Sequence, residues 1–310
     1  MAALMMTAVR LHDYGAPDKL VVEDVSRPEP GPGQVLIRIK AAGVNPADWK
    51  TGAGMYKQMM PLQFPWTPGL EAAGIVEAVG ADVQNFKPGQ EVFGALSGAY
   101  AEYALAKESD IQPKPSGISF EEAAAVPVGA LTSWGALIDT ADVKAGQHVL
   151  VHGAAGGVGN YAVQLARWKD AHVIGTASAA NVNFVRSLGV DSAIDYNAAP
   201  FESLVHDLDV VIDTVGGELA ARSFKVLRPG GVYVTVAGRL ADDAGKAEGV
   251  RAMRGGRTQP ETLRQISRLI EAKRVRPVLG KVFSLSEAAQ AQALSQTGHG
   301  RGRIILRTGT

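Results

Sequence analysis

The segment His148–Gly159 reads HVLVHGAAGGVG and indicates the fold class. The apolar stretch 149–151 predicts a buried strand, four glycines follow within seven residues, and the next pattern predicts a helix over 158–168. Small residues let the backbone approach a pyrophosphate, and free N–H groups at a helix start attract an anion. A plain turn would need one glycine, so this stretch predicts a dinucleotide phosphate site. The residues assigned to it are Ala154, Gly156, Gly157 and Val158.

Strands and helices alternate strictly around this turn. Short, fully apolar strands between amphipathic helices are typical of a parallel sheet that is covered on both faces. The pattern therefore predicts a doubly wound α/β Rossmann domain over 123–272, with 239–256 as a loop. Its further strands are expected at 173–176, 210–212 and 232–236, and its helices at 121–126, 131–140, 182–188, 219–227 and 260–272.

The two ends of the chain have a different pattern, with short strands broken by proline and glycine. Pro28–Gly33 (PEPGPG) excludes a helix or a central strand. In the last part, Ser284 and Glu287 form a predicted capping box before a helix over 287–295. We therefore expect 1–122 and 273–310 to form one discontinuous, β-rich domain. Its predicted strands cover 34–41, 72–79, 91–95, 100–105, 278–283 and 303–306.

The composition excludes several classes of function. The chain has 310 residues, no cysteine, and 31 basic against 31 acidic side chains. The lack of cysteine excludes disulfides, thiolate metal sites and a cysteine nucleophile. The balanced charge predicts neither nucleic-acid nor membrane binding. A local basic patch is conceivable at Arg251, Arg254 and Arg257, but the simpler interpretation of these residues is a solvated loop. The opening residues lack a secretory pattern, so a cytoplasmic location is expected.

The residues after the second Rossmann strand bear on the choice of cofactor. An NAD site usually places Asp or Glu about 20 residues beyond the glycine turn, where it binds the ribose 2′-hydroxyl. The segment Ser178–Ala180 has no acid, so a 2′-phosphate is not repelled and Ser178 can donate to it. Tyr196, after the next strand, is a second candidate, with packing as its alternative role. The sequence predicts NADPH, with NAD as the alternative cofactor.

Taken together, these segments resemble the zinc-independent quinone oxidoreductase branch of the medium-chain dehydrogenase/reductase superfamily. The resemblance runs nearly end to end. It implies a GroES-like catalytic domain beside the Rossmann domain, a substrate cleft between them, and a homodimer for which strand 232–236 is a compatible edge. The segments that carry it are Pro30–Gly43, Gly43–Asp48 (GVNPAD), Pro68–Gly74 (PGLEAAG), Gly153–Gly159, Arg186–Tyr196, Asp213–Gly216 (DTVG), Arg228–Gly231 and Thr297–Leu306 (TGHGRGRIIL).

The resemblance also indicates where the chain departs from its zinc-dependent relatives. Those proteins hold the catalytic metal with Cys and His at the positions that are Asn45 and Leu70 here. Zinc needs about three N, O or S ligands, which these residues do not supply. His148 and His152 lie on the strand before the glycine turn and are interpreted as packing or hydrogen-bonded side chains. No metal site is predicted.

Without a Lewis acid, the natural hydride acceptors are small molecules that are already polarised, namely quinones or enones. The resemblance places Asn45 near the nicotinamide as a hydrogen-bond donor; its alternative role is a turn before Pro46. Tyr56 is a candidate proton donor, or else a wall of the pocket. Thr132 is expected beside the nicotinamide, or as a helix cap. Cofactor contacts are also assigned to Val215, Ala237 and Arg239, with a plain surface charge as the alternative role of Arg239.

Three hypotheses remain at this point. The first is an NADPH-dependent reductase of quinones or α,β-unsaturated carbonyl compounds. The second is an enoyl-thioester reductase, and the third is a nucleotide-binding protein with little turnover. An apolar run from Met55 to Trp66 favours a hydrophobic mouth for the substrate, although a packed loop or a subunit contact has the same pattern.

Overall fold

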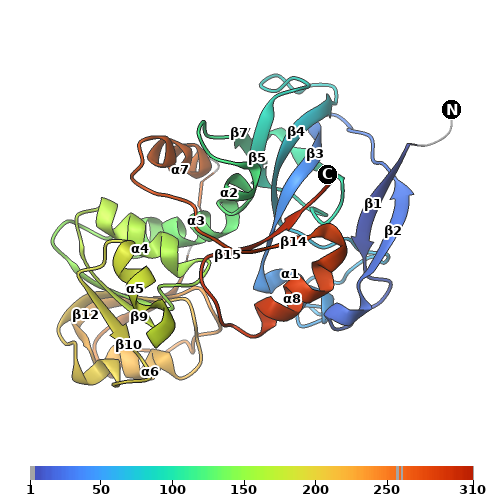
Figure 1. Cartoon of the computed structure of the whole chain (residues 1–310). Helices are drawn as coiled ribbons and strands as arrows, with labels where there is room; N and C mark the ends of the chain where they lie inside the picture. Colours follow the sequence, from blue (N-terminus) through green and yellow to red (C-terminus); the bar gives the residue numbers. More distant parts are fainter. Residues whose placement is uncertain (1–3, 256–257, 260, 310) are drawn as a thin grey trace.

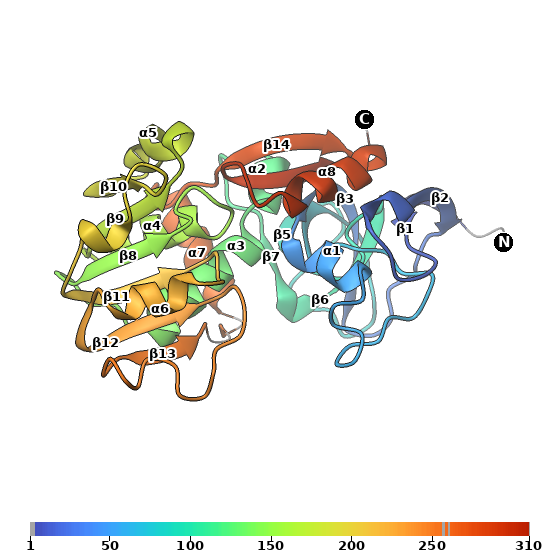
Figure 2. The same ribbon diagram turned by 90° about the horizontal axis from the view of Figure 1, so that it is seen from below.

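The computed structural model describes residues 4–255, 258–259 and 261–309. Two lobes lie side by side, and the last segment of the chain crosses back to the first lobe (Figures 1 and 2). Among the described residues, the strands form a two-stranded, a six-stranded and a seven-stranded sheet. No helix in this part of the chain combines the length and hydropathy that crossing a membrane requires.

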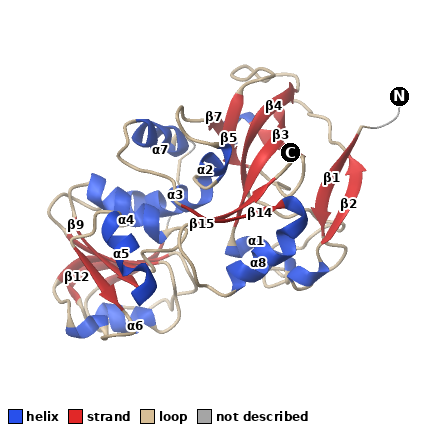
Figure 3. Cartoon of the chain, viewed as in Figure 1, coloured by secondary structure: helices blue, strands red, loops and turns tan. Residues whose placement is uncertain are grey.

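The six-stranded sheet forms the Rossmann domain, and all its neighbouring strands pair in parallel. Helices α4 (Gly159–Trp168) and α5 (Ala179–Ser187) lie on one side of it, and α6 (Leu219–Phe224) lies on the other (Figure 3). This is the predicted doubly wound architecture. In spatial order the strands are β10 (Ser192–Asp195), β9 (His172–Ala177), β8 (His148–His152), β11 (Leu208–Asp213), β12 (Leu227–Thr235) and β13 (Arg251–Arg254).

Strand β8 shows why both faces of the sheet are covered. Val149 and Val151 belong to the hydrophobic core that includes Tyr161 of α4, whereas Leu150 belongs to a second core with Phe224 of α6. Successive side chains of a strand point to opposite faces. A strand that is apolar at every position must therefore bury both of its faces, which is why the continuous run at 149–151 predicted the sheet correctly.

The catalytic domain is built on a sheet to which both ends of the chain contribute. Its long strand β3 (Gln34–Val44) pairs with β4 (Glu71–Val79), β6 (Tyr103–Lys107) and β15 (Arg303–Arg307). Strand β14 (Leu279–Ser284) follows β15 at one edge, and β5 (Glu91–Ala95) and β7 (Ile111–Pro113) follow β4 at the other. The only parallel pair in this described sheet is β14–β15.

Helices cover this sheet and connect the two lobes. The predicted capping box is present, because the Ser284 N–H donates to Glu287 at 2.8 Å. Helix α3 contacts α4 as well as β4 and β5, so it lies between the domains. The helices are α2 (Phe120–Ala124), α3 (Pro127–Trp134) continued by a π-helix (Gly135–Thr140), α7 (Thr262–Glu271) and α8 (Ala288–Gln296).

Some elements were not predicted from the sequence. Strands β1 (Met5–Arg10) and β2 (Val21–Ser26) form the two-stranded sheet, and helix α1 (Pro46–Gly52) begins directly after Asn45. Helix α1 is only seven residues long, too short for a clear periodicity to show in the sequence.

Two predictions about the far edge of the parallel sheet are wrong. Residues 251–254, expected within a loop, form β13, and Arg257 lies outside the described residues. Because β13 pairs with β12, the segment 232–236 is not an edge available to a partner chain. The four residues of β13 have no distinctive pattern, and pairing with β12 makes them a strand.

Candidate active site between the two domains

The glycine turn connects β8 to α4 with the tight geometry that its sequence predicted. Gly153 has a positive φ of 68°. A Cβ atom on Gly159 would overlap the Gly153 carbonyl oxygen, so a side chain cannot be accommodated there. The Ser133 hydroxyl donates to the Val158 carbonyl at 2.8 Å and ties α3 to this turn. The turn thus provides a backbone cradle at the start of a ten-residue helix, which is the geometry that suits a phosphate.

The other candidate cofactor residues come together because the strands are parallel. Ser178 follows β9, Tyr196 follows β10, Val215 follows β11, and Ala237 with Arg239 follows β12. The carboxyl ends of parallel strands share one edge of the sheet, and the strand order reverses between β8 and β11, where dinucleotides bind. The structure thus collects at one edge residues that are up to 86 positions apart in sequence, counted from Gly153 to Arg239.

These residues differ in their exposure. Ala154 is fully buried, whereas Gly156, Gly157, Val158, Ser178 and Ala237 are half-buried. Tyr196 and Val215 are exposed, as is Arg239. Thr132 is half-buried on α3. The exposed residues are therefore accessible to a ligand that lies across this edge.

His152 and His148 lie in opposite surroundings, although they share β8. His152 is buried, and its two ring nitrogens lie 3.2 Å from Thr176 Oγ1 and 3.1 Å from Ser223 Oγ. Burial lowers the pKa of His152 to about 4, so the ring is neutral at neutral pH. The expectation of a hydrogen-bonded histidine is confirmed for His152. His148 instead packs, because its exposed ring stacks on that of His172.

The catalytic domain contributes a buried polar cluster that sequence reasoning recognised only in part. We call Asn45, Glu71 and Arg303 the cleft cluster; their side chains are almost completely inaccessible. Asn45 Nδ2 donates to Glu71 Oε1 at 2.8 Å, and Arg303 Nη2 donates to Asn45 Oδ1 at 2.7 Å. Arg303 also forms an ion pair with Glu71. The sequence pattern singled out Asn45 and included the segments that contain Glu71 and Arg303, but it assigned neither of them a role.

Arg303 connects the cleft cluster to the glycine turn. A Cβ atom on Gly157 would lie 3.0 Å from both Cδ and Nη1 of Arg303. The segment before it is held there as well, because the Gly302 N–H donates to the Ala155 carbonyl at 2.8 Å. Arg303 Nε is buried without a hydrogen-bond partner among the described atoms. Burial lowers the pKa of Arg303 to about 10, so the guanidinium stays charged at neutral pH.

Asp48 lies next to this cluster and has an unusual acidity. Its Oδ2 accepts the Asn45 backbone N–H at 2.8 Å and the Tyr100 hydroxyl at 3.0 Å. Burial raises the pKa of Asp48 to about 6, although these bonds and the charge of Arg303 oppose the shift. Asp48 therefore fixes the start of α1, and with it the backbone of Asn45.

The candidate substrate mouth lies on the segment after α1. Met55, Met59 and Met60 are exposed there, and Tyr56 is half-buried. Tyr14 anchors this segment: its hydroxyl accepts the Leu62 N–H at 2.8 Å, and its ring makes an edge contact with Phe64. Exposed, flexible methionines provide an adaptable apolar surface.

The donor set in the cleft does not fit zinc. At the two positions where zinc-dependent relatives carry metal ligands, the Asn45 side chain is hydrogen-bonded to Glu71 and Arg303, and the Leu70 side chain has no atom that can bind a metal. Among the described residues, no three His, Asp or Glu side chains gather in a way that would hold a metal ion. A buried guanidinium beside the carboxylate also disfavours a second cation at this point.

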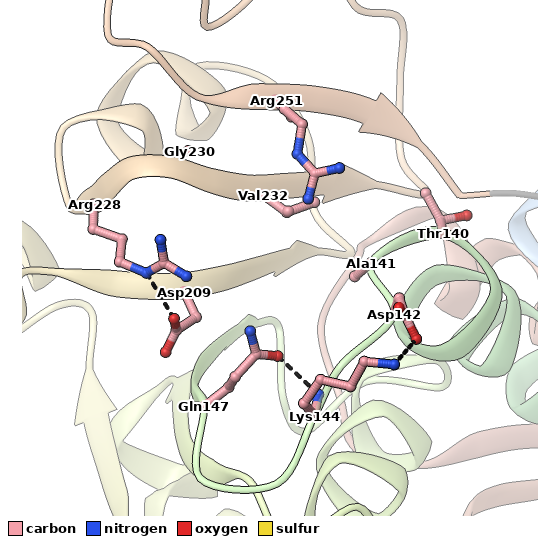
Figure 4. Close-up of a pocket in the computed structure, with 10 residues that line it drawn as sticks. All are labelled: Thr140, Ala141, Asp142, Lys144, Gln147, Asp209, Arg228, Gly230, Val232 and Arg251. Carbon is pink, nitrogen blue, oxygen red and sulfur yellow. Dashed lines mark hydrogen bonds and ion pairs between the residues drawn. The ribbon is translucent and has the colours of Figure 1, made fainter.

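A distinct pocket lies at the opposite end of the parallel sheet. It has a volume of about 270 Å³ and is lined by residues of β12, by the starts of β11 and β13, and by the loop before β8 (Figure 4). Two of its cations are already paired, Lys144 with Asp142 and Arg228 with Asp209. The glycine turn is at the other edge of the sheet, so this pocket is separate from the candidate active site.

Comparison with known proteins agrees with this geometry. Residues 31–116 match the alcohol dehydrogenase GroES-like domain family, and residues 188–306 match the zinc-binding dehydrogenase family. Similar proteins include a quinone oxidoreductase of Sus scrofa, which is 35% identical over 97% of this chain and 98% of its own length. A 2-methylene-furan-3-one reductase of Solanum lycopersicum is also 35% identical, over 97% of this chain and 79% of its length.

A similar solved structure is that of the quinone oxidoreductase from Coxiella burnetii. It superposes with a TM-score of 0.91 at 33% identity, and the match covers 98% of this chain and 99% of that one. With its GroES-like domain, its Rossmann sheet and relatives that align along nearly its whole length, the chain belongs to the quinone oxidoreductase type of the medium-chain dehydrogenase/reductase family of oxidoreductases.

Proposed function

We propose that the protein reduces quinones or α,β-unsaturated carbonyl compounds with NADPH in the cleft between its two domains. The observation that carries the proposal is how near Arg303 of the cleft cluster lies to Gly157 of the glycine turn, since a Cβ atom on Gly157 would be 3.0 Å from Arg303 Nη1. It brings the phosphate cradle and the polar side chains of the catalytic domain to one place. The similarity to a quinone oxidoreductase and to an enone reductase supports the same class of acceptor.

The residues at the carboxyl edge suit the cofactor that the proposal requires. The glycine turn would hold the pyrophosphate, and Arg303 would pair with it through Nη1, the donor that lies near Gly157. Ser178, at the start of α5, would receive the ribose phosphate, with Tyr196 and Arg239 exposed at neighbouring strand ends. When bound, the nicotinamide supplies the hydride.

The other residues would act on the acceptor. Addition of hydride to the β carbon of an enone leaves an enolate oxygen, which hydrogen-bond donors stabilise. Asn45 has a second amide N–H besides the one given to Glu71, and we assign it this role. Tyr56 would then donate a proton to the α carbon. The methionines of the mouth would bind the apolar body of the acceptor and exclude water.

The decisive experiment is the oxidation of NADPH and of NADH with one small quinone and one simple enone, with and without a chelator. We expect faster turnover with NADPH and no effect of the chelator. Absence of turnover with both cofactors and both acceptors would contradict the proposal. Tyr56→Phe should lower turnover of the enone far more than turnover of the quinone, because a reduced quinone takes its protons on oxygen and can receive them from water.

The preference for NADPH has a test of its own. Ser178→Asp would place a carboxylate where the 2′-phosphate is expected, and repulsion should shift the preference toward NADH. Ser178→Asn is the matched neutral control. An unchanged ratio of NADPH to NADH efficiency in Ser178→Asp would show that the phosphate binds elsewhere.

The predicted homodimer and cytoplasmic location also stay proposals. The exposed edges of the parallel sheet are β10 and β13 in the described structure, so a pairing between nucleotide domains would use one of these. Light scattering tests the mass in solution, and cell fractionation tests the location.

A further inference from the structure

The carboxylate of Glu71 is the point at which three separate parts of the chain meet. The side chain is completely buried at the start of β4. Its Oε2 accepts the Val128 N–H at 2.7 Å, at the first turn of α3, and its Oε1 accepts the Asn45 amide at 2.8 Å. Arg303 pairs with the same Oε1. The fold keeps room for this carboxylate, because a Cβ atom on Gly43 would overlap Oε1.

These contacts determine the orientation of the Asn45 amide. Its nitrogen faces the carboxylate of Glu71 and its oxygen faces the guanidinium of Arg303. A flipped amide would set an N–H₂ group against the guanidinium and an oxygen against the carboxylate, so both contacts would become repulsive. Glu71 and Arg303 together therefore select one orientation.

Glu71 acts on Arg303 in a second way. The guanidinium is buried against Gly157, and only a nearby anion makes that burial tolerable. Glu71 is the anion with which it pairs. The pairing uses Nη2, whereas Nη1 lies on the side of the glycine turn and Nε is buried without a hydrogen-bond partner among the described atoms.

We propose that Glu71 is the positioning residue of this site, whose one carboxylate sets the Asn45 amide for the acceptor and holds Arg303 against the phosphate turn. The inference rests on the proposed function for the role of Asn45, but its effect on Arg303 is measurable without turnover. It assigns to the glutamate of the GLE segment a task that needs no metal. Glu71 itself touches neither reactant.

The test begins with Glu71→Gln, which keeps the shape and replaces one carboxylate oxygen with an amide. The new N–H₂ group must face either the Val128 N–H or the donors of Asn45 and Arg303, so one contact becomes repulsive. We expect kcat to fall about 100-fold with little change in the KM of the acceptor. NADPH affinity, measured by fluorescence of the bound nicotinamide, should fall about tenfold as Arg303 is released.

The double variant Glu71→Gln with Asn45→Asp separates positioning from folding. The amide introduced at position 71 can donate to the carboxylate introduced at position 45, and that carboxylate restores the negative charge beside Arg303. We expect the thermal midpoint and the NADPH affinity to return toward the wild-type values. The kcat should stay low, because position 45 then lacks an N–H group on its side chain.

Glu102→Gln is the matched control. It makes the same chemical change at a half-buried carboxylate whose Oε2 accepts the Thr7 N–H at 2.8 Å, in the outer part of the catalytic domain. We expect its kcat and NADPH affinity to equal those of the wild type.

Several outcomes would overturn the inference. Wild-type kcat in Glu71→Gln would show that the carboxylate does not position Asn45, and tighter NADPH binding would show that it only screens Arg303. Recovery of kcat in the double variant would show that charge balance alone matters. If the wild type binds NADPH but turns over no quinone or enone, the proposed function fails, while the affinities of the variants still decide the role of Glu71 toward Arg303.

Discussion

Two buried polar clusters lie on either side of the glycine turn, and they differ in how completely their hydrogen bonds are satisfied. The sheet cluster consists of His152, Thr176 and Ser223 and belongs to the Rossmann domain alone. Ser223 donates to the Leu219 carbonyl at 2.6 Å, so it accepts from His152 Nε2, and Nδ1 accepts from Thr176. The chain of bonds is neutral and every ring nitrogen is used.

The cleft cluster is charged, joins both domains and is incomplete. Arg303 Nε and, nearby, Asp48 Oδ1 are buried without partners among the described atoms. Buried polar groups are nearly always hydrogen-bonded in folded proteins, so the exceptions require an explanation. We interpret the complete cluster as structural and the incomplete one as a site that a ligand completes.

The largest expected effect comes from removing the cation of the cleft cluster. Arg303→Met would leave Glu71 buried without its counter-ion, which should lower the free energy of unfolding by about 3–5 kcal/mol. NADPH binding should be lost as well. Denaturant unfolding and cofactor fluorescence measure the two effects.

Arg307→Met on the same strand is the control for Arg303→Met. Its side chain is mostly exposed and pairs with Glu121 at 2.8 Å. An exposed pair contributes about 1 kcal/mol at most. Equal losses in the two variants would contradict the special role of Arg303.

His152 of the sheet cluster and Asp48, which lies next to the cleft cluster, should also respond to acid in opposite directions. In the folded protein the pKa of His152 is lowered from 6.5 to about 4. The free energy of unfolding should therefore decrease by about 3 kcal/mol as the pH falls from 6.5 to 4. The folded pKa of Asp48 is raised from 3.8 to about 6, so folding gains stability as pH falls from about 6 to 3.8.

The wild type should therefore show a nearly flat stability between pH 4 and 6, because the two effects offset each other. His152→Gln removes one of them and should make stability rise on acidification over this range. Asp48→Asn should make it fall more steeply than in the wild type. Parallel curves for all three proteins, measured by urea unfolding at each pH, would refute the assignment.

A smaller effect is expected from narrowing the space between the cleft cluster and the turn. Gly157→Ala would press a methyl group against Arg303, whereas a Cβ on Gly156 would meet only the Gly153 oxygen, at 3.2 Å. We expect NADPH affinity to fall about tenfold in Gly157→Ala, a cost of about 1.4 kcal/mol. Gly156→Ala should lower NADPH affinity less than Gly157→Ala does. A larger loss in Gly156→Ala would indicate that the phosphate lies at the other end of the turn.

The smallest effect should come from the sheet cluster. Ser223→Ala removes the acceptor of His152 and should lower the free energy of unfolding by about 1–2 kcal/mol. NADPH affinity and kcat should not change, since every atom of this cluster is bonded within the domain. A loss of affinity at constant stability would mean that the sheet cluster also serves the cofactor.

The fold was largely predictable because its signals are local. The glycines of 153–159, the apolar run before them and the capping box at Ser284 each lie within a dozen residues, and their physics depends on neighbours in the chain. Strand β13 was missed because four residues, RAMR, become a strand only by pairing with β12. The edge of the sheet was misplaced for the same reason.

The candidate site was predictable only in part. The ends of the parallel strands could be assigned to one edge of the sheet. Topology alone therefore predicted that Ser178, Tyr196 and Val215 lie at the same edge. Whether these residues bind the cofactor stays a prediction. Nothing in the sequence showed that Asn45 meets an arginine 258 positions away.

The Rossmann architecture, the place of the glycine turn and the lack of a thiolate metal site follow from the amino-acid sequence, because they depend on local pattern and composition. Which polar side chains meet depends instead on the folded chain. Glu71, Arg303 and Asn45 come together only because β15 returns to pair with β3 and brings Arg303 between the two domains. The burial of that cluster cannot be predicted from any local pattern. Burial strengthens the electrostatic interactions among its charges and makes its atoms without hydrogen-bond partners energetically costly.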